Sequence, residues 1–190
     1  MPTSKKEKTK VQEVAPAPAA RKKRNIPQGL WTKCPSCEHV VYNKALQENY
    51  SICPKCNYHF TISAWERIQQ LIDKDTFKEC DANLSSLDPL QFQGTKSYTQ
   101  KLQEDQQRTG LTDACVTGEG LLLEHKVALG VTDSRFIMGS MGAVVGEKLT
   151  RLIETAIKKQ LPVVIVSGSG GGARMYEGVL SLMQDRKSVV

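Results

Sequence analysis

Four cysteines constrain this chain more than any other feature of its sequence. Cys34, Cys37, Cys53 and Cys56 form two Cys-Pro-x-Cys pairs, with fifteen residues between the pairs. This spacing is typical of a tetrahedral structural zinc site, in which each pair forms a tight turn that directs two thiolates at one point. Because four sulfur ligands leave no coordination position open to water, we expect the metal to hold structure and to do no chemistry.

Two alternatives to a site of four cysteines are open to these residues. His39 and His59 lie close by in the sequence, and either is able to replace a cysteine as a ligand. Two disulfides would also use all four cysteines, but nothing marks the chain as secreted. The other two cysteines, Cys80 and Cys115, are expected to be reduced thiols. Together with the zinc pattern, they indicate a reducing, cytoplasmic compartment.

The first 30 residues differ in composition from the rest of the chain. They carry eight basic residues against two acidic ones, so this tail alone accounts for the net charge of +6. The remainder of the chain is balanced in charge, which does not support a general basic surface for nucleic acid. We expect residues 1–30 to be disordered, because they lack apolar periodicity. No stretch resembles a signal peptide or approaches the length of a transmembrane helix.

The pattern from residue 31 to residue 110 predicts a small module followed by helices. Residues 31–62 have strand-forming side chains around the cysteines, as expected of a β zinc ribbon. Ser63 and Glu66 match a capping box that begins a short amphipathic helix. After an irregular stretch over residues 76–96, a polar helix is expected over residues 97–109, ended by Gly110, with Tyr98 and Leu102 on its inner face.

From residue 114 the pattern becomes that of an α/β domain. A meander of three strands is followed by a loop, a helix, a strand buried on both faces, a glycine-rich turn and a further helix. These segments are residues 114–117, 120–124 and 126–132 for the strands, 136–142 for the loop, 145–159 for the helix, 161–166 for the buried strand, 167–172 for the turn, and 175–183 for the last helix.

The end of the sequence does not complete such a domain. A lone buried strand with its helices cannot bury a sheet, so we expect residues 63–184 to be the N-terminal part of a truncated domain. Residues 185–190 break the apolar helix and are expected to be non-native. Our hypothesis is that they are translated sequencing-adapter DNA, since GAT CGG AAG AGC GTC GTG encodes them. An unbroken genomic reading frame that keeps these residues would contradict it.

The glycine-rich turn, Ser-Gly-Ser-Gly-Gly-Gly-Ala-Arg over residues 167–174, is the best candidate for chemistry. Glycines let a ligand approach the backbone closely, and the following helix adds free N–H groups and a positive dipole end. A P-loop is excluded because no lysine follows the glycines, and a serine nucleophile elbow because no G-x-S-x-G is present. A dinucleotide fingerprint fits from Gly168 to Ala173 but is weak alone. The remaining interpretation is an oxyanion hole made of backbone amides.

Three motifs then give the chain a specific resemblance. Gly-Gly-Ala-Arg-Met at residues 171–175, followed by Glu177, resembles the signature of biotin-dependent carboxyltransferases of the crotonase-like superfamily. Two further motifs resemble the beta-subunit family of bacterial and plastid acetyl-CoA carboxylase carboxyltransferases. One is the entry into the zinc ribbon, Ile-Pro-Gln-Gly-Leu-Trp-Thr-Lys-Cys-Pro-Ser-Cys at residues 26–37, and the other is Gly-Ser-Met-Gly-Ala-Val-Val-Gly-Glu-Lys at residues 139–148. The resemblance runs from about residue 25 to residue 184.

Two departures from the family pattern affect the turn. Gly168 stands where the family has alanine, and the glycine run is one residue longer. Only Gly139 precedes Ser-Met-Gly, where the family tends to have two glycines. Which amides face the thioester is therefore open by about one residue, and the family's second glycine-rich segment lies beyond the end of this chain. The fragment alone is expected to be inactive.

The resemblance implies an α/β, crotonase-like carboxyltransferase domain that moves a carboxyl group from carboxybiotin to acetyl-CoA, giving malonyl-CoA for fatty acid biosynthesis. It implies one structural Zn²⁺, biotin carried in trans on the biotin carboxyl carrier protein, and an alpha2-beta2 assembly with carboxyltransferase subunit alpha. Biotin carboxylase would complete a larger, ATP-dependent complex. Nucleic acid is a minor further partner, since the family's ribbon has been suggested to contact it.

The resemblance also assigns roles to individual residues. Gly171, Gly172 and Ala173 are expected to be the backbone oxyanion donors. Gly139 and Gly142 are expected to shape the CoA pocket. Arg174 has two candidate roles, pairing with a CoA phosphate or a structural salt bridge, and Glu177 is expected to be structural. The alternative function is that of a zinc-ribbon module that binds nucleic acid or has a regulatory role, with the α/β part as a non-catalytic scaffold.

Overall fold

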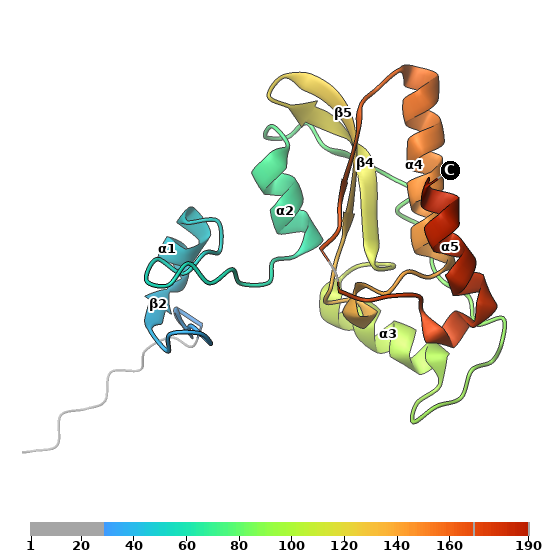
Figure 1. Cartoon of the computed structure of the whole chain (residues 1–190), viewed down its shortest axis with the longest axis horizontal. Helices are drawn as coiled ribbons and strands as arrows, with labels where there is room; N and C mark the ends of the chain where they lie inside the picture. The colour runs from blue at the N-terminus through green and yellow to red at the C-terminus, as the bar shows by residue number, and fades with distance from the viewer. Residues whose placement is uncertain (1–28, 169, 190) are drawn as a thin grey trace, which may run out of the picture.

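The computed structural model describes residues 29–168 and 170–189, with side chains of the last helix described as far as Gln184. The expectations for residues 1–28 and for Ser169 lie outside this range. Figure 1 shows a small N-terminal part joined by an extended segment to a larger α/β body. No helix in the described part of the chain is long and apolar enough to cross a membrane.

The N-terminal part is a small ribbon with little regular structure. The strands β1 (Trp31–Lys33) and β2 (Val40–Tyr42) pair antiparallel, with Trp31 opposite Tyr42, and α1 (Asn43–Glu48) follows at once. Around the second cysteine pair only one isolated bridge forms, between Ile52 and His59. The expectation of strands is therefore confirmed for the first pair, whereas α1 was not anticipated.

Two helices begin at capping boxes, of which the sequence analysis predicted the first and missed the second. Ser63 caps α2 (Ala64–Leu71) with Glu66 as its partner, and Ser97 caps α3 (Tyr98–Thr109) with Gln100. Gly110 ends α3 in the left-handed conformation, and Tyr98 and Leu102 are buried, as expected. Residues 76–96 are irregular except for the short strand β3 (Lys78–Cys80).

The body is built on a four-stranded mixed sheet in the order β3-β4-β5-β6. The strands β4 (Cys115–Leu122) and β5 (His125–Thr132) form one antiparallel hairpin, whose turn residues Leu123 and Glu124 both have positive φ. The expected break between residues 117 and 120 is wrong. Gly118 lies within the continuous strand. A side chain there would collide with Phe77, whose ring lies 2.5 Å from the position of an added Cβ, so the glycine makes room for this ring.

The helix α4 (Ala143–Lys159) connects β5 to β6 (Val163–Val166), which runs parallel to β5. The apolar stripe predicted for this helix is confirmed for Val145, Leu149, Leu152 and Ala156, which are buried, but not for Ile157, which is 71% exposed. A core of apolar side chains from α2, α3, β4, β5 and α4 fills the space between the helices and the sheet.

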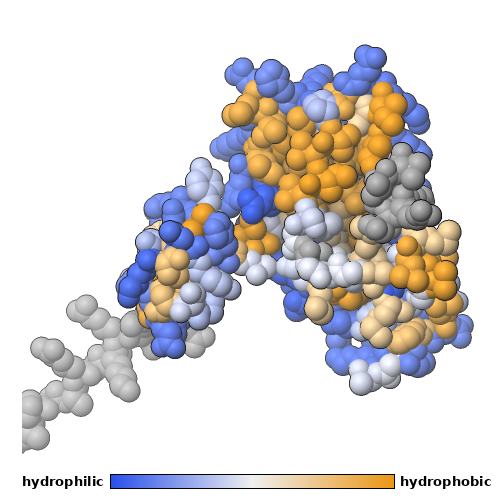
Figure 2. Space-filling view, viewed as in Figure 1, coloured by the Kyte–Doolittle hydropathy of each residue, from blue (hydrophilic) through white to orange (hydrophobic). Residues whose placement is uncertain are grey.

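The strand β6 is not buried on both faces as predicted. It is the last strand of the described sheet, and Val163 and Ile165 are 38% and 45% exposed. Figure 2 shows apolar surface over this part of the body. The short 3-10 turn η2 (Met175–Glu177) and the helix α5 (Val179–Val189) follow, and α5 packs beside α4. The single helix predicted over residues 175–183 is thus divided at Gly178, and the predicted break at residue 185 is wrong, because α5 continues to Val189. The apolar Val179, Leu182 and Met183 are also exposed.

Candidate functional site: a cysteine cluster and a glycine turn

The two cysteine pairs fold into turns of the same design. The N–H of Cys34 donates to His39 O at 2.8 Å, and the N–H of Cys53 donates to Tyr58 O at the same distance. In each turn the residue four positions after the first cysteine, Glu38 or Asn57, has a positive φ of 58° or 59°. The two Cys-Pro-x-Cys motifs therefore specify the same backbone shape twice.

These turns bring the four sulfur atoms together. The Sγ atoms of Cys34, Cys37, Cys53 and Cys56 all lie within 4.8 Å of one another. The Cys34–Cys56 and Cys37–Cys53 pairs are separated by 3.6 and 3.8 Å. A tetrahedral zinc with bonds of about 2.3 Å requires sulfur atoms about 3.8 Å apart, so the four thiols fit one zinc ion. A disulfide would need about 2.05 Å, and the cysteines are free.

Neither histidine takes part in this cluster. In the described part of the chain, the group of side chains able to hold a metal contains the four cysteines alone. His39 contributes backbone groups to the first turn: its carbonyl oxygen accepts from the Cys34 N–H, and its own N–H bonds to the Cys37 sulfur. The geometry thus supports a closed site with four sulfur ligands, which holds the ribbon together and offers no open position for catalysis.

The glycine turn leaves β6 and crosses the end of β5. The N–H of Gly168 donates to the Thr132 hydroxyl at 2.9 Å. Further on, the chain runs beside the loop that precedes α4: Met141 donates to Gly172 O, and Arg174 donates to Met141 O, each at 2.9 Å. These two bonds form a parallel bridge between Met141 and Ala173.

The same segment brings together the two glycine motifs that the sequence singled out. An added Cβ on Gly171 would lie 2.6 Å from the carbonyl oxygen of Met138 and 2.8 Å from the amide nitrogen of Ser140. Gly139, between them, is buried with φ of 68°. The loop before α4 therefore packs directly against the glycine run.

Within the described residues, the backbone N–H groups of Gly171, Gly172 and Ala173 have no hydrogen-bond acceptor. Gly172 and Ala173 are also exposed. Exposed N–H groups without an internal acceptor, on a backbone that the loop before α4 holds in place, are suited to bind an oxyanion.

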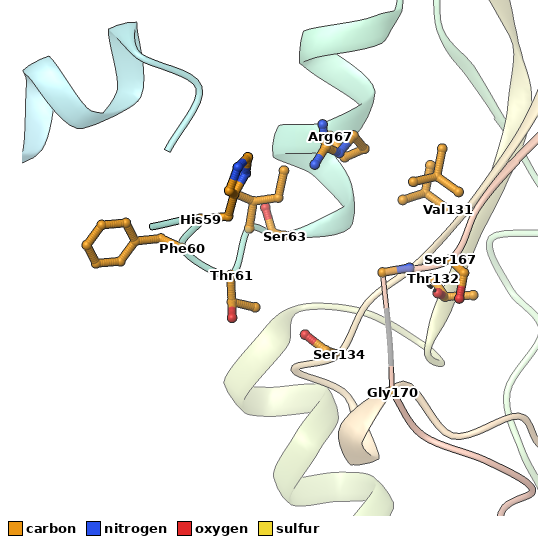
Figure 3. A pocket seen from close by; sticks show the side chains of 13 residues that line it. His59, Phe60, Thr61, Ser63, Arg67, Val131, Thr132, Ser134, Ser167 and Gly170 are labelled. Atoms are coloured by element: carbon orange, nitrogen blue, oxygen red, sulfur yellow. Dashed lines mark hydrogen bonds between the residues drawn. The ribbon is translucent and has the colours of Figure 1, made fainter. Parts of the chain in front are cut away.

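A cavity of about 380 Å³ opens beside the start of this turn. Its walls come from the segment after the second cysteine pair, with His59, from α2, with Arg67, and from the ends of β5 and β6, with Thr132, Ser167 and Gly170. Figure 3 shows Arg67 across the cavity from Ser167. The zinc ribbon and the glycine turn therefore border one cavity.

Arg174 lies beneath the glycine turn and is 1% exposed. Its Nη2 donates to Asp113 Oδ1 at 2.7 Å and to Ser140 O at 2.9 Å, and its Nη1 donates to Asp113 Oδ2 at 3.0 Å. Nε donates to the Ser140 hydroxyl at 3.3 Å. Burial alone would lower the pKa of Arg174, but hydrogen bonds from the guanidinium to Asp113 outweigh it and hold that pKa above its ordinary value.

Glu177, the second acid beside this arginine, caps α4. Its Oε2 accepts from the Ala143 N–H at 2.6 Å, and its Oε1 accepts from the Tyr98 hydroxyl at 2.6 Å and the Ser86 hydroxyl at 3.1 Å. A carboxylate at a helix N-terminus is favoured by the helix dipole. Glu177 is therefore structural, as expected.

The residues that were expected to contact CoA, namely Arg174, Gly139 and Gly142, are all buried. Arg174 already donates to several partners and has no exposed side-chain surface, so the geometry supports its structural role over pairing with a CoA phosphate. An added Cβ on Gly142 would lie 2.9 Å from the Arg174 Cζ. Direct CoA contact by these three residues is not supported, whereas a role in shaping the turn is.

Sequence reasoning missed the partners of Arg174. Asp113 is 61 residues away in the chain, and Ser86 and Tyr98 are 88 and 76 residues away. The one available signal was Asp113, which lies shortly before the strand β4. An Asp at such a position is too common to indicate a buried ion pair.

Comparisons with known proteins agree with this geometry. A family model described as "Acetyl-CoA carboxylase zinc finger domain" matches residues 31–56, and one described as "Carboxyl transferase domain" matches residues 61–185. The chain is 51% identical over 173 residues to the acetyl-coenzyme A carboxylase carboxyl transferase subunit beta of Rhodopirellula baltica, covering 91% of this chain and 55% of that protein. It is 51% identical over 166 residues to the chloroplastic subunit beta of Pyropia yezoensis, covering 87% and 57%.

Among solved structures, the transcarboxylase 12S crystallised with methylmalonyl-coenzyme A and methylmalonic acid is 28% identical, with a TM-score of 0.54 over 66% of this chain and 22% of that one. A single-chain, multi-domain long-chain acyl-CoA carboxylase, 21% identical with a TM-score of 0.51 over 76% of this chain and 14% of that one, shares the fold. The α/β, crotonase-like fold with an N-terminal zinc ribbon is thus confirmed.

The chain spans about half the length of the curated relatives it matches. Within that half, the ribbon with its four clustered thiols and the glycine turn above a buried arginine both fall inside the matched regions. Since the carboxyl transferase model accounts for most of the chain, from residue 61 to residue 185, this protein belongs to the carboxyl transferase family.

Proposed function

We propose that this chain is the beta-type component of an acetyl-CoA carboxylase. It takes part in the step that moves the carboxyl group of carboxybiotin, held by the biotin carboxyl carrier protein, to acetyl-CoA, giving malonyl-CoA for fatty acid biosynthesis. One observation carries the proposal: the three amides of Gly171, Gly172 and Ala173 are free within the described structure, in a chain of this family.

The residues around the turn suit a reaction that needs oxyanion stabilisation more than a side-chain base. When the acetyl methyl group loses a proton, negative charge develops on the thioester oxygen. Backbone N–H groups aimed at that oxygen lower the barrier, and loss of one such donor typically costs about 2.7–4 kcal/mol. We assign this role to Gly171, Gly172 and Ala173. Arg174 and Glu177 make no contact with the substrate in this proposal, and they hold the backbone of the glycine turn in place.

The cavity beside the turn gives a place for the substrate. It lies between α2 and the ends of β5 and β6, and the segment that carries His59 forms one of its walls. We propose that the zinc ribbon, fixed by Cys34, Cys37, Cys53 and Cys56, covers this cavity and has no chemical step of its own.

The proposed partners are those of an acetyl-CoA carboxylase complex. Carboxyltransferase subunit alpha would complete an alpha2-beta2 assembly, and biotin carboxylase and the biotin carboxyl carrier protein would supply carboxybiotin at the expense of ATP. The relatives named as acetyl-CoA carboxylase subunits support this assignment. We place the complex in the cytoplasm, because reduced thiols are needed to bind zinc.

The test is the reverse reaction of the complete beta subunit with its alpha partner. Malonyl-CoA and free biotin should give acetyl-CoA and carboxybiotin, and release of acetyl-CoA is measured by a coupled assay. Acetyl-CoA formation that depends on both biotin and the alpha subunit is the expected result. Absence of turnover, together with salt-sensitive RNA binding, would instead favour the nucleic-acid-binding alternative.

A further inference from the structure

Two buried side chains, one just before and one at the end of the turn η2, hold the loop before α4 at both of its ends. Arg174 binds the Ser140 carbonyl oxygen at 2.9 Å, and Glu177 binds the Ala143 N–H at 2.6 Å. The backbone bridge between Met141 and Ala173 lies between these two contacts. The loop and the glycine run are therefore joined at three successive points, and neither segment is fixed by a regular sheet.

The orientation of Arg174 and Glu177 is set in turn by residues from distant elements. Asp113, ahead of β4, makes a two-bonded ion pair with Arg174 at 2.7 and 3.0 Å. The Tyr98 hydroxyl, from α3, donates to Glu177 at 2.6 Å and accepts from Arg174 Nη1 at 3.1 Å. Tyr98 thus contacts both of the side chains that hold the loop, through one oxygen atom.

Within the described structure, the Tyr98 hydroxyl interacts with Glu177, with Arg174 and with the neighbouring Ser86 hydroxyl. The residue is fully buried, and its ring stacks on Tyr176 with centroids 5.1 Å apart and an interplanar angle of 2°. Burial raises the pKa of Tyr98 well above its ordinary value, so the hydroxyl keeps its proton and remains a donor at neutral pH. The ring accounts for packing, and the hydroxyl accounts for the polar contacts.

We propose that Tyr98 is a positioning residue for the oxyanion site: its hydroxyl aligns Glu177 and Arg174, and through them sets where the amides of Gly171, Gly172 and Ala173 point. This inference rests on the proposed function of those amides. Tyr98 touches no substrate. Its effect passes through the three contacts between the loop and the glycine run, so its loss alters the placement of the donors and leaves in place the cavity walls formed by α2 and by the ends of β5 and β6.

Tyr98→Phe removes the hydroxyl and keeps the stacked ring. Tyr176→Phe is the matched control, because it removes a hydroxyl from the other ring of the same stack, and that hydroxyl makes no hydrogen bond within the described residues. In the complete beta subunit with its alpha partner, we expect Tyr98→Phe to lower kcat about tenfold, a fraction of the hundredfold loss that follows a displacement of about 1 Å. The KM for malonyl-CoA should change less than about twofold, since the displaced donors act on charge that develops in the transition state.

A second measurement does not depend on turnover. Amide hydrogen exchange, read by mass spectrometry, should become faster in peptides covering residues 139–143 and 170–177 of Tyr98→Phe, and should be unchanged in these peptides of Tyr176→Phe. Equal kcat values for the two variants, or equal exchange in both regions, would overturn the positioning role. An inactive wild-type complex would refute the proposed function instead, and the exchange comparison would then decide the positioning role alone.

Discussion

The close contact of Gly171 with the neighbouring loop predicts that this glycine cannot be replaced. A Cβ at this position would lie 2.6 Å from Met138 O and 2.8 Å from Ser140 N, and both are backbone atoms that cannot rotate away. Reaching 3.4 Å, where ordinary van der Waals contact begins, requires the two segments to separate by about 0.8 Å. We therefore expect Gly171→Ala to displace the amides proposed to bind the oxyanion.

The size of the effect follows from this displacement. A misplacement of about 1 Å costs about a hundredfold in rate, so Gly171→Ala should lower kcat by about 30- to 100-fold, or about 2–2.7 kcal/mol of barrier. The neighbouring Gly172→Ala is the control, because nothing lies within 4 Å of its added Cβ and the substitution keeps the N–H donor. Any loss of kcat in Gly172→Ala should be several-fold smaller than in Gly171→Ala, because its Cβ makes no contact with the loop before α4.

The assay is the biotin-dependent conversion of malonyl-CoA to acetyl-CoA by the complete enzyme, with kcat and KM measured separately. Thermal melting of each variant distinguishes a displaced turn from a body that fails to fold. Near-equal kcat values for the Gly171 and Gly172 variants would refute the reasoning, since it assigns the whole difference to contact with the 139–142 loop.

Two further predictions concern the ribbon and the stability of the body. Metal analysis should find one zinc per chain, and Cys37→Ser should lose it and make residues 31–62 sensitive to protease, while Cys80→Ser, outside the cluster, should keep it. Burial would raise the pKa of Asp133, but hydrogen bonds from Arg135 and the Ala64 N–H outweigh it and hold that pKa below its ordinary value. The stability from this group is therefore present above the unfolded pKa of about 3.9 and lost as the pH falls through the lower folded value. Urea unfolding should show a weaker acid dependence in Asp133→Asn than in the wild type, and an equal dependence would contradict this account.

Local signals in the sequence were enough to predict several elements. Ser63 and Glu66 form the expected capping box, and Gly110 ends α3 where a glycine after a helical pattern should. The helix α4 was predictable because its apolar period is long and regular. The cysteine cluster was predictable because its spacing alone fixes the shape of both turns. In each case the residues that decide the structure are close together in the sequence.

The features that escaped prediction depend on residues far apart. Gly118 looked like a strand break, yet it serves to admit the ring of Phe77 above a continuous strand. The continuous apolar run at β6 suggested burial on both faces, but in the described sheet this strand lies at the edge. Arg174 could not be assigned between two roles until Asp113 was found beside it. No local pattern distinguishes such a glycine, strand or arginine from its alternative.

The edge position of β6 bears on how the chain behaves in isolation. The strand has a row of backbone groups that no strand of the described sheet pairs with, and Val163 and Ile165 project from it into solvent. Such an edge is a template for strand addition by any extended chain it meets, including another copy of itself. A protein in which this edge stays uncovered should therefore self-associate through β6, and Ile165→Lys should keep it dispersed.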